Sequence, residues 1–268
     1  MDLSFCSFSS GSSGNCYMVK TETTTLLVDA GISGKKIFEG LEKTATSIES
    51  VAGILITHEH SDHIKSLRIV TKKALNIKAY ANAGTWSAIE GLVAQDKQVC
   101  FTTGQEFYIG DIKIRSFLIS HDAREPVGYS FFAGGRQISI VTDTGYLTDE
   151  IMYEVRNADL LILEANHEVG MLQYCRYPFY IKQRILGDKG HLSNVAAAEG
   201  LCRLLQSRMD DGKDAIRVLL AHLSRENNEP SLAHISVKNI LAESDFYIGK
   251  NIWLDIILRD QLSAIYEL

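Results

Sequence analysis

The residues of this chain that are most able to do chemistry lie in one segment: His58-Glu59-His60-Ser61-Asp62-His63. The segment directly follows the apolar run at 53–56, which is typical of a buried strand. Imidazole and carboxylate groups are the ligands by which proteins bind zinc and its first-row neighbours. Residues two apart on extended backbone point to the same side, so His58 and His60 can bind one ion. The chain then turns, and Asp62 and His63 can reach a second. The spacing predicts two adjacent metal ions, with a histidine-rich surface loop as the competing interpretation.

Three further residues of ligand type follow apolar runs elsewhere in the chain. His121 follows the run at 115–120, Asp143 follows 138–142, and His222 follows 218–221. Since segments at strand ends carry functional groups, several strands would deliver these side chains to one edge of a sheet. The alternative is that each is a lone turn or capping residue.

The elements that must position these residues are predicted from hydrophobic patterns. Strands are expected at 3–8, 17–20, 26–28, 53–56, 78–81, 106–108, 113–119, 127–132, 137–141, 160–163, 215–220 and 252–258. Helices are expected at 35–42, 64–75, 148–157, from the N-cap Ser193 through Leu205, and at 232–242 after the N-cap Ser231. This order predicts an α/β fold in which two mixed β-sheets pack together with helices outside, as four layers. No low-complexity linker interrupts it, so residues 1–268 are expected to form a single domain.

Composition excludes several other classes of protein. The chain has 268 residues, of which 46% are hydrophobic and 22% charged, as in ordinary globular proteins. No apolar run approaches the roughly 18 residues of a membrane span, so no membrane insertion is expected. The N-terminal residues lack the basic and apolar regions of a secretory signal. The five cysteines are scattered and odd in number, which favours a reducing compartment and predicts a cytoplasmic location.

The net charge of −6 does not favour non-specific binding to a polyanion. Two local groups of basic residues are nevertheless candidates for contact with an anionic substrate. They are Lys65, Arg68, Lys72, Lys73 and Lys78 in one, and Lys182, Arg184 and Lys189 in the other. The alternative is that both are solvated helix faces.

Taken in chain order, the HxHxDH segment and the later His, Asp and His resemble the metallo-β-lactamase superfamily over nearly the whole chain. The resemblance implies an αββα sandwich with a dinuclear metal site at the sheet edge. It implies that His58, His60 and His121 bind one ion. It implies that Asp62, His63 and His222 bind the other, with Asp143 bridging the two. Asp29, at an earlier strand end, would support the site without binding metal.

Other segments narrow the resemblance within the superfamily. Residues 7–15, 121–123, 190–194 and 222–228 resemble the YycJ/WalJ-like hydrolases, a group similar to ribonuclease Z and to the cyclic-phosphate diesterase of phosphonate metabolism. The likeness to ribonuclease Z implies that His191 protonates the leaving oxygen and that Glu164 orients His191. Residues 144–163 are too few for the long arm with which ribonuclease Z holds tRNA. Residues 144–221 are too few for the domain inserted in β-CASP nucleases.

The expected chemistry is phosphodiester hydrolysis. Two ions about 4 Å apart lower the pKa of a bridging water, and the resulting hydroxide attacks phosphorus. Asp62 is also a candidate to take the proton of the attacking water. Candidate phosphate contacts are Ser12, Ser13 and Asn15 in a glycine-rich turn, together with Arg225. A plain tight turn is the alternative there.

The sequence therefore predicts a dinuclear metal-dependent phosphodiesterase, a nuclease of exonuclease type acting on DNA or RNA, with Zn²⁺, Mn²⁺ or Fe²⁺ as cofactor. Within enzymes, the alternative is a hydrolase of a small cyclic phosphate, a thioester or a lactone. Outside enzymes, it is a non-catalytic, metal-binding regulatory partner in cell-envelope signalling. A homo-oligomer is compatible with each.

Overall fold

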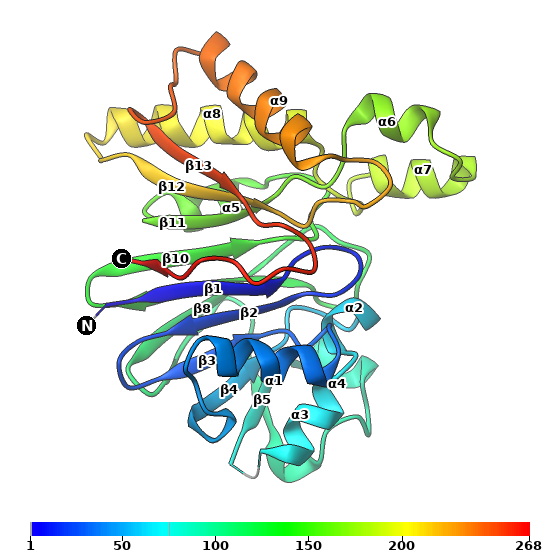
Figure 1. Cartoon of the computed structure of the whole chain (residues 1–268), viewed down its shortest axis with the longest axis vertical. Coiled ribbons are helices and arrows are strands. Elements are labelled where there is room, and N and C mark those ends of the chain that lie inside the picture. The colour runs from blue at the N-terminus through cyan, green and yellow to red at the C-terminus, as the bar shows by residue number, and fades with distance from the viewer. Residues whose placement is uncertain (1, 75) are drawn as a thin grey trace.

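The computed structural model of the protein describes residues 2–74 and 76–268, and Figure 1 shows its arrangement. One sheet has seven strands in the order β14-β1-β2-β3-β4-β5-β6. These are β1 (Ser4–Ser9), β2 (Cys16–Lys20), β3 (Thr25–Val28), β4 (Val51–Leu55), β5 (Lys78–Asn82), β6 (Gln98–Phe101) and β14 (Tyr266–Glu267). Strands β3 to β6 pair in parallel, whereas β14, β1, β2 and β3 pair antiparallel.

The second sheet also has seven strands, in the order β13-β12-β11-β10-β9-β8-β7. These are β7 (Glu106–Ile109), β8 (Ile112–Leu118), β9 (Val127–Ala133), β10 (Arg136–Val141), β11 (Leu160–Glu164), β12 (Ile216–Ala221) and β13 (Ile252–Ile256). Strands β7 to β10 form an antiparallel meander, and β10 to β13 pair in parallel. Both sheets are mixed, as the sequence predicts.

The two sheets pack face to face, and helices cover both outer faces (Figure 1). One face is covered by α1 (Gly34–Lys43), α3 (Leu67–Lys73) and α4 (Ala83–Ala88), and the other by α5 (Asp149–Val155), α8 (Asn194–Asp210) and α9 (Pro230–Glu243). Strand β11 shows how the sequence fits this arrangement. Leu160 and Ile162 lie between the sheets, while Leu161 and Leu163 lie under the helices. A strand buried on both faces reads as one continuous apolar run. The predicted four-layer sandwich is confirmed.

Several strands end at the same edge of this sandwich because they run in parallel. Strands β3 and β4 are parallel, as are β10, β11 and β12. Strand β8 runs in the direction of β10 because both are antiparallel to β9 between them. The segments that follow these strands therefore meet at one edge, and they carry the predicted site residues.

The structure corrects two predicted helices. The helix expected over 64–75 is two helices, α2 (Ser61–Ile64) and α3, and its expected end at Leu75 lies outside the described residues. The break occurs because the backbone N–H of Ser66 donates to the carbonyl of Ala30. Ser231 is not an N-cap, since α9 begins at Pro230 after the N-cap Glu229. Proline is favoured at the first helical position, where its missing N–H costs nothing.

Some elements are not predicted from the sequence. They are α4, β6, β14, α6 (Val169–Tyr174), α7 (Phe179–Leu186) and the short 3₁₀ helices η1 (Ile48–Ser50) and η2 (Gln95–Lys97). Helix α7 buries none of its residues, so it has no apolar stripe to signal it.

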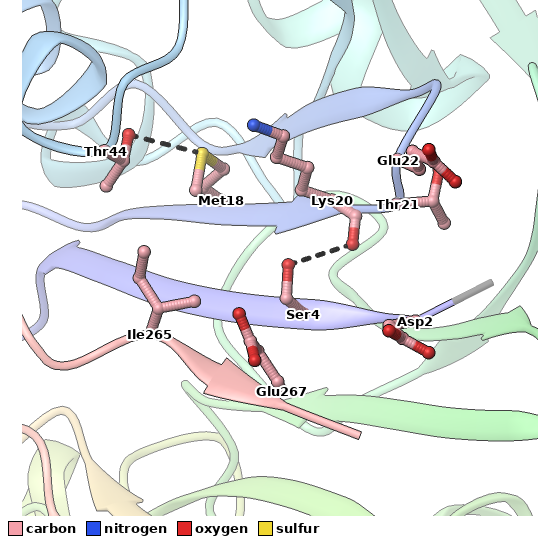
Figure 2. A pocket seen from close by; sticks show the side chains of 9 residues that line it. All are labelled: Asp2, Ser4, Met18, Lys20, Thr21, Glu22, Thr44, Ile265 and Glu267. Carbon is pink, nitrogen blue, oxygen red and sulfur yellow. Dashed lines mark hydrogen bonds between the residues drawn. The ribbon is translucent and has the colours of Figure 1, made fainter.

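The two ends of the chain meet at the edge of the first sheet, where β14 pairs with β1. Figure 2 shows this end, where the hydroxyl of Ser4 donates to the carbonyl of Lys20 at 3.0 Å and Glu267 lies on the neighbouring strand. A cavity of about 450 Å³ here has no histidine in its lining, and it lies at the opposite end of β1 from Ser10. No helix in the described part of the chain is both long and apolar enough to span a membrane.

Candidate metal centre

A cavity of about 340 Å³ opens at the edge where the parallel strands end. The residues lining it are Ser12, His60, Ser61, Asp62, His121, Asp143, Arg184, His191 and His222. The structure thus brings together side chains that are more than 200 positions apart in the sequence. His58 and His63 lie beneath this cavity, fully or almost fully buried.

The first group of ligand atoms comes from His58, His60 and His121, whose imidazole nitrogens all lie within 4.8 Å of one another. Nε2 of His58 lies 3.1 Å from Nδ1 of His60. The residues come from the segment after β4, the start of α2 and the segment after β8. Three convergent imidazoles are a common ligand set of a first-row metal ion.

The second group comes from Asp62, His63 and His222, with ligand atoms again within 4.8 Å of one another. Nε2 of His63 lies 3.6 Å from Oδ2 of Asp62. Asp143 lies between the two groups. Its Oδ2 is 3.5 Å from Nε2 of His63, and its Oδ1 is 3.5 Å from Nε2 of His222 and 3.9 Å from Nε2 of His121. The structure thus brings together the residues of both predicted groups. Two overlapping sets, one of His58, His63 and Asp143 and one of Asp143, Glu164, His191 and His222, also converge within 4.8 Å, so the division of ligands between two ions stays a prediction.

Two atoms at the centre of the cluster are buried without a hydrogen-bond partner among residues 2–74 and 76–268. They are Oδ2 of Asp143 and Nε2 of His222. A buried polar atom without a partner costs about 1–3 kcal/mol, and such atoms are rare in native proteins. Both atoms have lone pairs that a cation accepts. The donor set therefore fits divalent metal ions.

The charges around the cluster also favour a bound cation. Burial by itself lowers the pKa of His63, but the carboxylates of Asp29 and Asp143 outweigh it and raise the pKa to about 10. Burial is likewise outweighed at His222, where Asp143 and Glu164 raise the pKa to about 9. Although burial opposes its ionisation, Asp143 has a pKa well below its usual range because His222 and His63 lie beside it. The buried carboxylates thus favour positive charge at this place.

The backbone is constrained where the strands deliver these groups. Asp29, Asp143 and His222 all have positive φ, at 62°, 61° and 54°. Residues other than glycine in this region cost about 1–3 kcal/mol each, and they persist only where the surrounding structure fixes them. Each of the three follows a buried strand, β3, β10 or β12. The side chains of all three residues face the cluster from these strand ends.

Asp29 supports the cluster from behind, where the resemblance places it. Its Oδ2 accepts from Nδ1 of His63 at 2.7 Å and from the hydroxyl of Thr57 at 2.9 Å. Its Oδ1 accepts from the backbone N–H of Thr57 at 2.9 Å. The carboxylate fixes the orientation of His63 and leaves Nε2 facing Asp143. Such a partner also raises the basicity of a metal-binding imidazole.

Glu164 supports the other side through two histidines at once. Its Oε1 lies 2.8 Å from Nδ1 of His191 and 2.8 Å from Nδ1 of His222. Its Oε2 accepts from the backbone N–H groups of Thr144 at 2.9 Å and Leu192 at 3.2 Å. Burial alone would raise the pKa of Glu164, but the two histidines lower it to about 2. Glu164 is therefore ionised. Because it binds Nδ1 of His191, the other ring nitrogen, Nε2, is free of Glu164 on the side of the cavity that His191 lines.

The four predicted phosphate contacts lie at different depths. Ser12 lines the cluster cavity and also a neighbouring cavity of about 640 Å³, which Ser13 and Arg225 line too. Asn15 is fully buried, its Oδ1 accepts from the N–H of Gly11 at 2.8 Å, and its Nδ2 lies 3.1 Å from Nε2 of His63. The structure therefore places three of the four on cavity walls and Asn15 beneath the cluster.

Two residues of this site, Thr57 and Asp122, have no role in the sequence analysis, and a third, Arg184, is predicted there only as a contact for an anionic substrate. The hydroxyl of Thr57 lies 2.9 Å from Oδ2 of Asp29 and 3.0 Å from Nδ1 of His58. Its position in the sequence, directly between the apolar run at 53–56 and the HxHxDH segment, is the signal that could have identified it. Asp122 has Oδ1 3.5 Å from Nε2 of His121. Its Oδ2 accepts from Nε of Arg184 at 2.6 Å, a partner that no spacing in the sequence indicates.

The family follows from comparison with known proteins. A family model described as a beta-lactamase superfamily domain matches residues 24–209. The chain belongs to the metallo-β-lactamase superfamily. The matched range includes every candidate ligand except His222. The superfamily predicted from the HxHxDH segment is thus confirmed.

Relatives within the superfamily confirm the expected YycJ/WalJ-like subgroup. The chain is 41% identical over 253 residues to exodeoxyribonuclease YycJ of Bacillus anthracis, an alignment that covers 93% of each protein. It is 42% identical over 245 residues to exodeoxyribonuclease WalJ of Streptococcus pneumoniae serotype 2 strain D39, covering 90% of this chain and 88% of that protein.

Solved structures show the same superfamily fold. The metallo-β-lactamase fold protein YhfI of Bacillus subtilis aligns with a TM-score of 0.73 at 17% identity over 100% of both chains. The short form of human tRNase Z aligns with a TM-score of 0.60 at 16% identity over 98% of this chain and 99% of that one. These two likenesses establish the fold.

Proposed function

We propose that this superfamily member is a dinuclear metal-dependent phosphodiesterase that degrades DNA as an exonuclease. The observation that carries the proposal is the position of Asp143 between two groups of ligand atoms. A carboxylate placed this way can bind two ions at once, and paired ions are suited to displacement at phosphorus.

In the proposal, His58, His60 and His121 would hold one ion. Asp62, His63 and His222 would hold the other, and Asp143 could contribute a carboxylate oxygen to each. Zn²⁺, Mn²⁺ and Fe²⁺ all accept nitrogen and oxygen ligands of this kind. When bound, such ions neutralise charge on the reacting phosphate and make water more acidic.

The other residues of the site transfer protons or orient the histidines. His191 has Nδ1 committed to Glu164, so Nε2 is the nitrogen that protonates the departing oxygen. Glu164 accepts from Nδ1–H of His191, so it is the imidazolium form of His191 that gives its Nε2 proton to the departing oxygen. Asp29 accepts from Nδ1–H of His63, which leaves the lone pair of His63 Nε2 for a metal ion. Asp62 lies on the cavity wall with a quarter of its side chain exposed, where it can accept the proton of the attacking water.

The substrate phosphate is proposed to contact Ser12, Ser13 and Arg225, which line the two adjoining cavities. Asn15 acts from below by holding the turn in place through the N–H of Gly11. DNA is favoured as substrate because the relatives that align with nearly the whole chain are named exodeoxyribonucleases. RNA, a small cyclic phosphate, a thioester and a lactone are the alternatives that the test must separate. A purely regulatory metal-binding protein would not need His191 poised in the cavity.

The test is hydrolysis by the purified protein loaded in turn with Zn²⁺, Mn²⁺ or Fe²⁺. Bis(p-nitrophenyl) phosphate reports phosphodiesterase chemistry. Labelled single- and double-stranded DNA and RNA, each with 5′-phosphate or 5′-hydroxyl ends, report substrate class and polarity. We expect mononucleotides to accumulate from DNA, and EDTA to abolish the reaction. No hydrolysis of any phosphodiester with any of these metals would refute the proposal.

We further propose that residues 1–268 act as one domain in the cytoplasm. The pairing of β1 with β14 supports the first part, because the ends of the chain complete one sheet. The cysteines support the second, since all five are free and Cys6 and Cys16 are buried. A single urea transition followed by both tryptophan fluorescence and circular dichroism is the expected result for one domain.

A further inference from the structure

Helices α6 and α7 form a segment that is set off from the rest of the molecule. Figure 1 shows them projecting on the side where α2 lies, beyond the edge at which the strands end. Helix α6 buries only Leu172, and α7 buries none of its residues. Large aromatic side chains are exposed on the segment: Tyr174 at 91%, Phe179 at 75% and Tyr180 at 70%. A group of exposed apolar side chains of this kind marks an interaction surface.

This segment has a positive net charge, whereas the net charge of the whole chain is negative. Residues 169–187 contain no aspartate or glutamate, but they contain Arg176, Lys182 and Arg184. The chain as a whole has a net charge of −6. Aromatic rings beside cations are the features that bind single-stranded nucleic acid, because bases stack on the rings and phosphates pair with the cations.

The segment is also continuous with the metal centre. Arg184 of α7 lines the cluster cavity, and its Nε donates to Asp122 beside His121. Tyr177, between α6 and α7, lines the adjoining cavity together with Arg225. A strand that has its scissile phosphate at the cluster would therefore reach this segment directly.

We infer that the α6–α7 segment binds the single-stranded part of the nucleic-acid substrate, with bases stacked on Phe179 and Tyr180 and phosphates paired with Arg176 and Lys182. The inference rests on the proposed nuclease function and adds where the substrate strand lies. A second copy of the chain is a poorer occupant. A twofold interface places the same surface on both sides, so cations would face cations.

The test compares a long and a short substrate. The double variant Phe179→Ala/Tyr180→Ala of the metal-loaded protein is expected to raise the KM for a single-stranded DNA oligonucleotide by about tenfold or more, with kcat retained. Bis(p-nitrophenyl) phosphate needs only the cluster cavity, so its hydrolysis monitors folding and metal loading. Tyr108→Ala is the matched control, since Tyr108 is 68% exposed on β7 and outside the segment. This control is expected to leave the KM for the oligonucleotide unchanged.

The outcomes separate this inference from the proposed function. An unchanged KM in the double variant, with phosphodiesterase activity intact, overturns the inference alone. If the parent protein hydrolyses neither substrate, the proposed function fails, and binding of a fluorescent oligonucleotide is measured by anisotropy instead. Equal binding by parent and double variant then overturns the inference, and weaker binding by the variant supports it. A change from dimer to monomer without a change in KM assigns the surface to a second copy and also overturns it.

Discussion

His191 and His222 are held by the same carboxylate oxygen, since Nδ1 of each lies 2.8 Å from Oε1 of Glu164. One of these histidines is the proposed proton donor and the other a proposed metal ligand. The shared acceptor fixes both rings by one group, which is itself held by the backbone N–H groups of Thr144 and Leu192. Proton transfer and metal binding are therefore expected to respond together to a change at Glu164 and separately to changes at the histidines.

Replacing His191 with alanine should remove the proton donor and leave the metal centre in place. Turnover is expected to fall by roughly 10²–10⁴-fold, the usual range for general acid–base catalysis. Both ions should remain bound, because His191 belongs to neither of the proposed ligand groups. Steady-state kinetics with an oligonucleotide and elemental analysis of the purified variant measure the two effects. Turnover equal to that of the parent protein would remove His191 from the mechanism.

Glu164→Gln should damage both functions although it changes size very little. Each oxygen of Glu164 accepts from two N–H donors, so the amide NH₂ faces two donors whichever way it is turned. His222 could relieve one clash only by moving its proton to Nε2, which would remove the lone pair needed for the metal. Metal affinity is expected to fall by about 10–100-fold, as for other groups that orient metal-binding histidines. Competition with a chromogenic chelator measures the metal affinity of each variant. If Glu164→Gln bound metal as tightly as His191→Ala does, this prediction would be contradicted.

His60→Ala should lower metal content and abolish activity together. His60 is half-buried on the cavity wall and is one of three imidazoles in its group, so its loss leaves two histidines for that ion. The expected result is fewer ions per chain by elemental analysis and no detectable oligonucleotide hydrolysis. His234→Ala is the matched control, since His234 lies on α9 outside the cluster. Full metal content in His60→Ala would refute its assignment as a ligand.

Gly31→Ala should destabilise the protein at the metal motif. A Cβ atom at Gly31 would overlap the carbonyl of Asp62, which also accepts from the N–H of Asn15 at 2.8 Å. Overpacking of this kind costs about 1–3 kcal/mol, and here the obstacle is backbone that cannot rotate away. Gly170→Ala is the control, because a Cβ there meets nothing within 4 Å and helix α6 favours alanine. Urea unfolding should show a lower midpoint for the first variant and an equal or higher one for the second.

The sequence by itself determined the superfamily, the layer order and the set of candidate ligands. Apolar runs that end in His or Asp identify strands with ligands at their ends, and parallel pairing then brings those ends to one edge. His58, Asp143 and His222 could be found in this way because the signal of each is local. The same is true of the Ser193 cap.

The resemblance implied that Glu164 orients His191 and that Asp29 supports the site, but only the tertiary structure showed the further contacts that orient it. Several of these contacts join segments that lie far apart in the chain. They are the contact of Glu164 with both His191 and His222, and the pair of Asp122 and Arg184. The burial of Asn15 likewise depends on the packing of distant segments. Such contacts depend on how sheets and loops pack, and no spacing encodes them. Helix α7 was missed for a related reason, because a helix that buries no face leaves no apolar periodicity in its sequence.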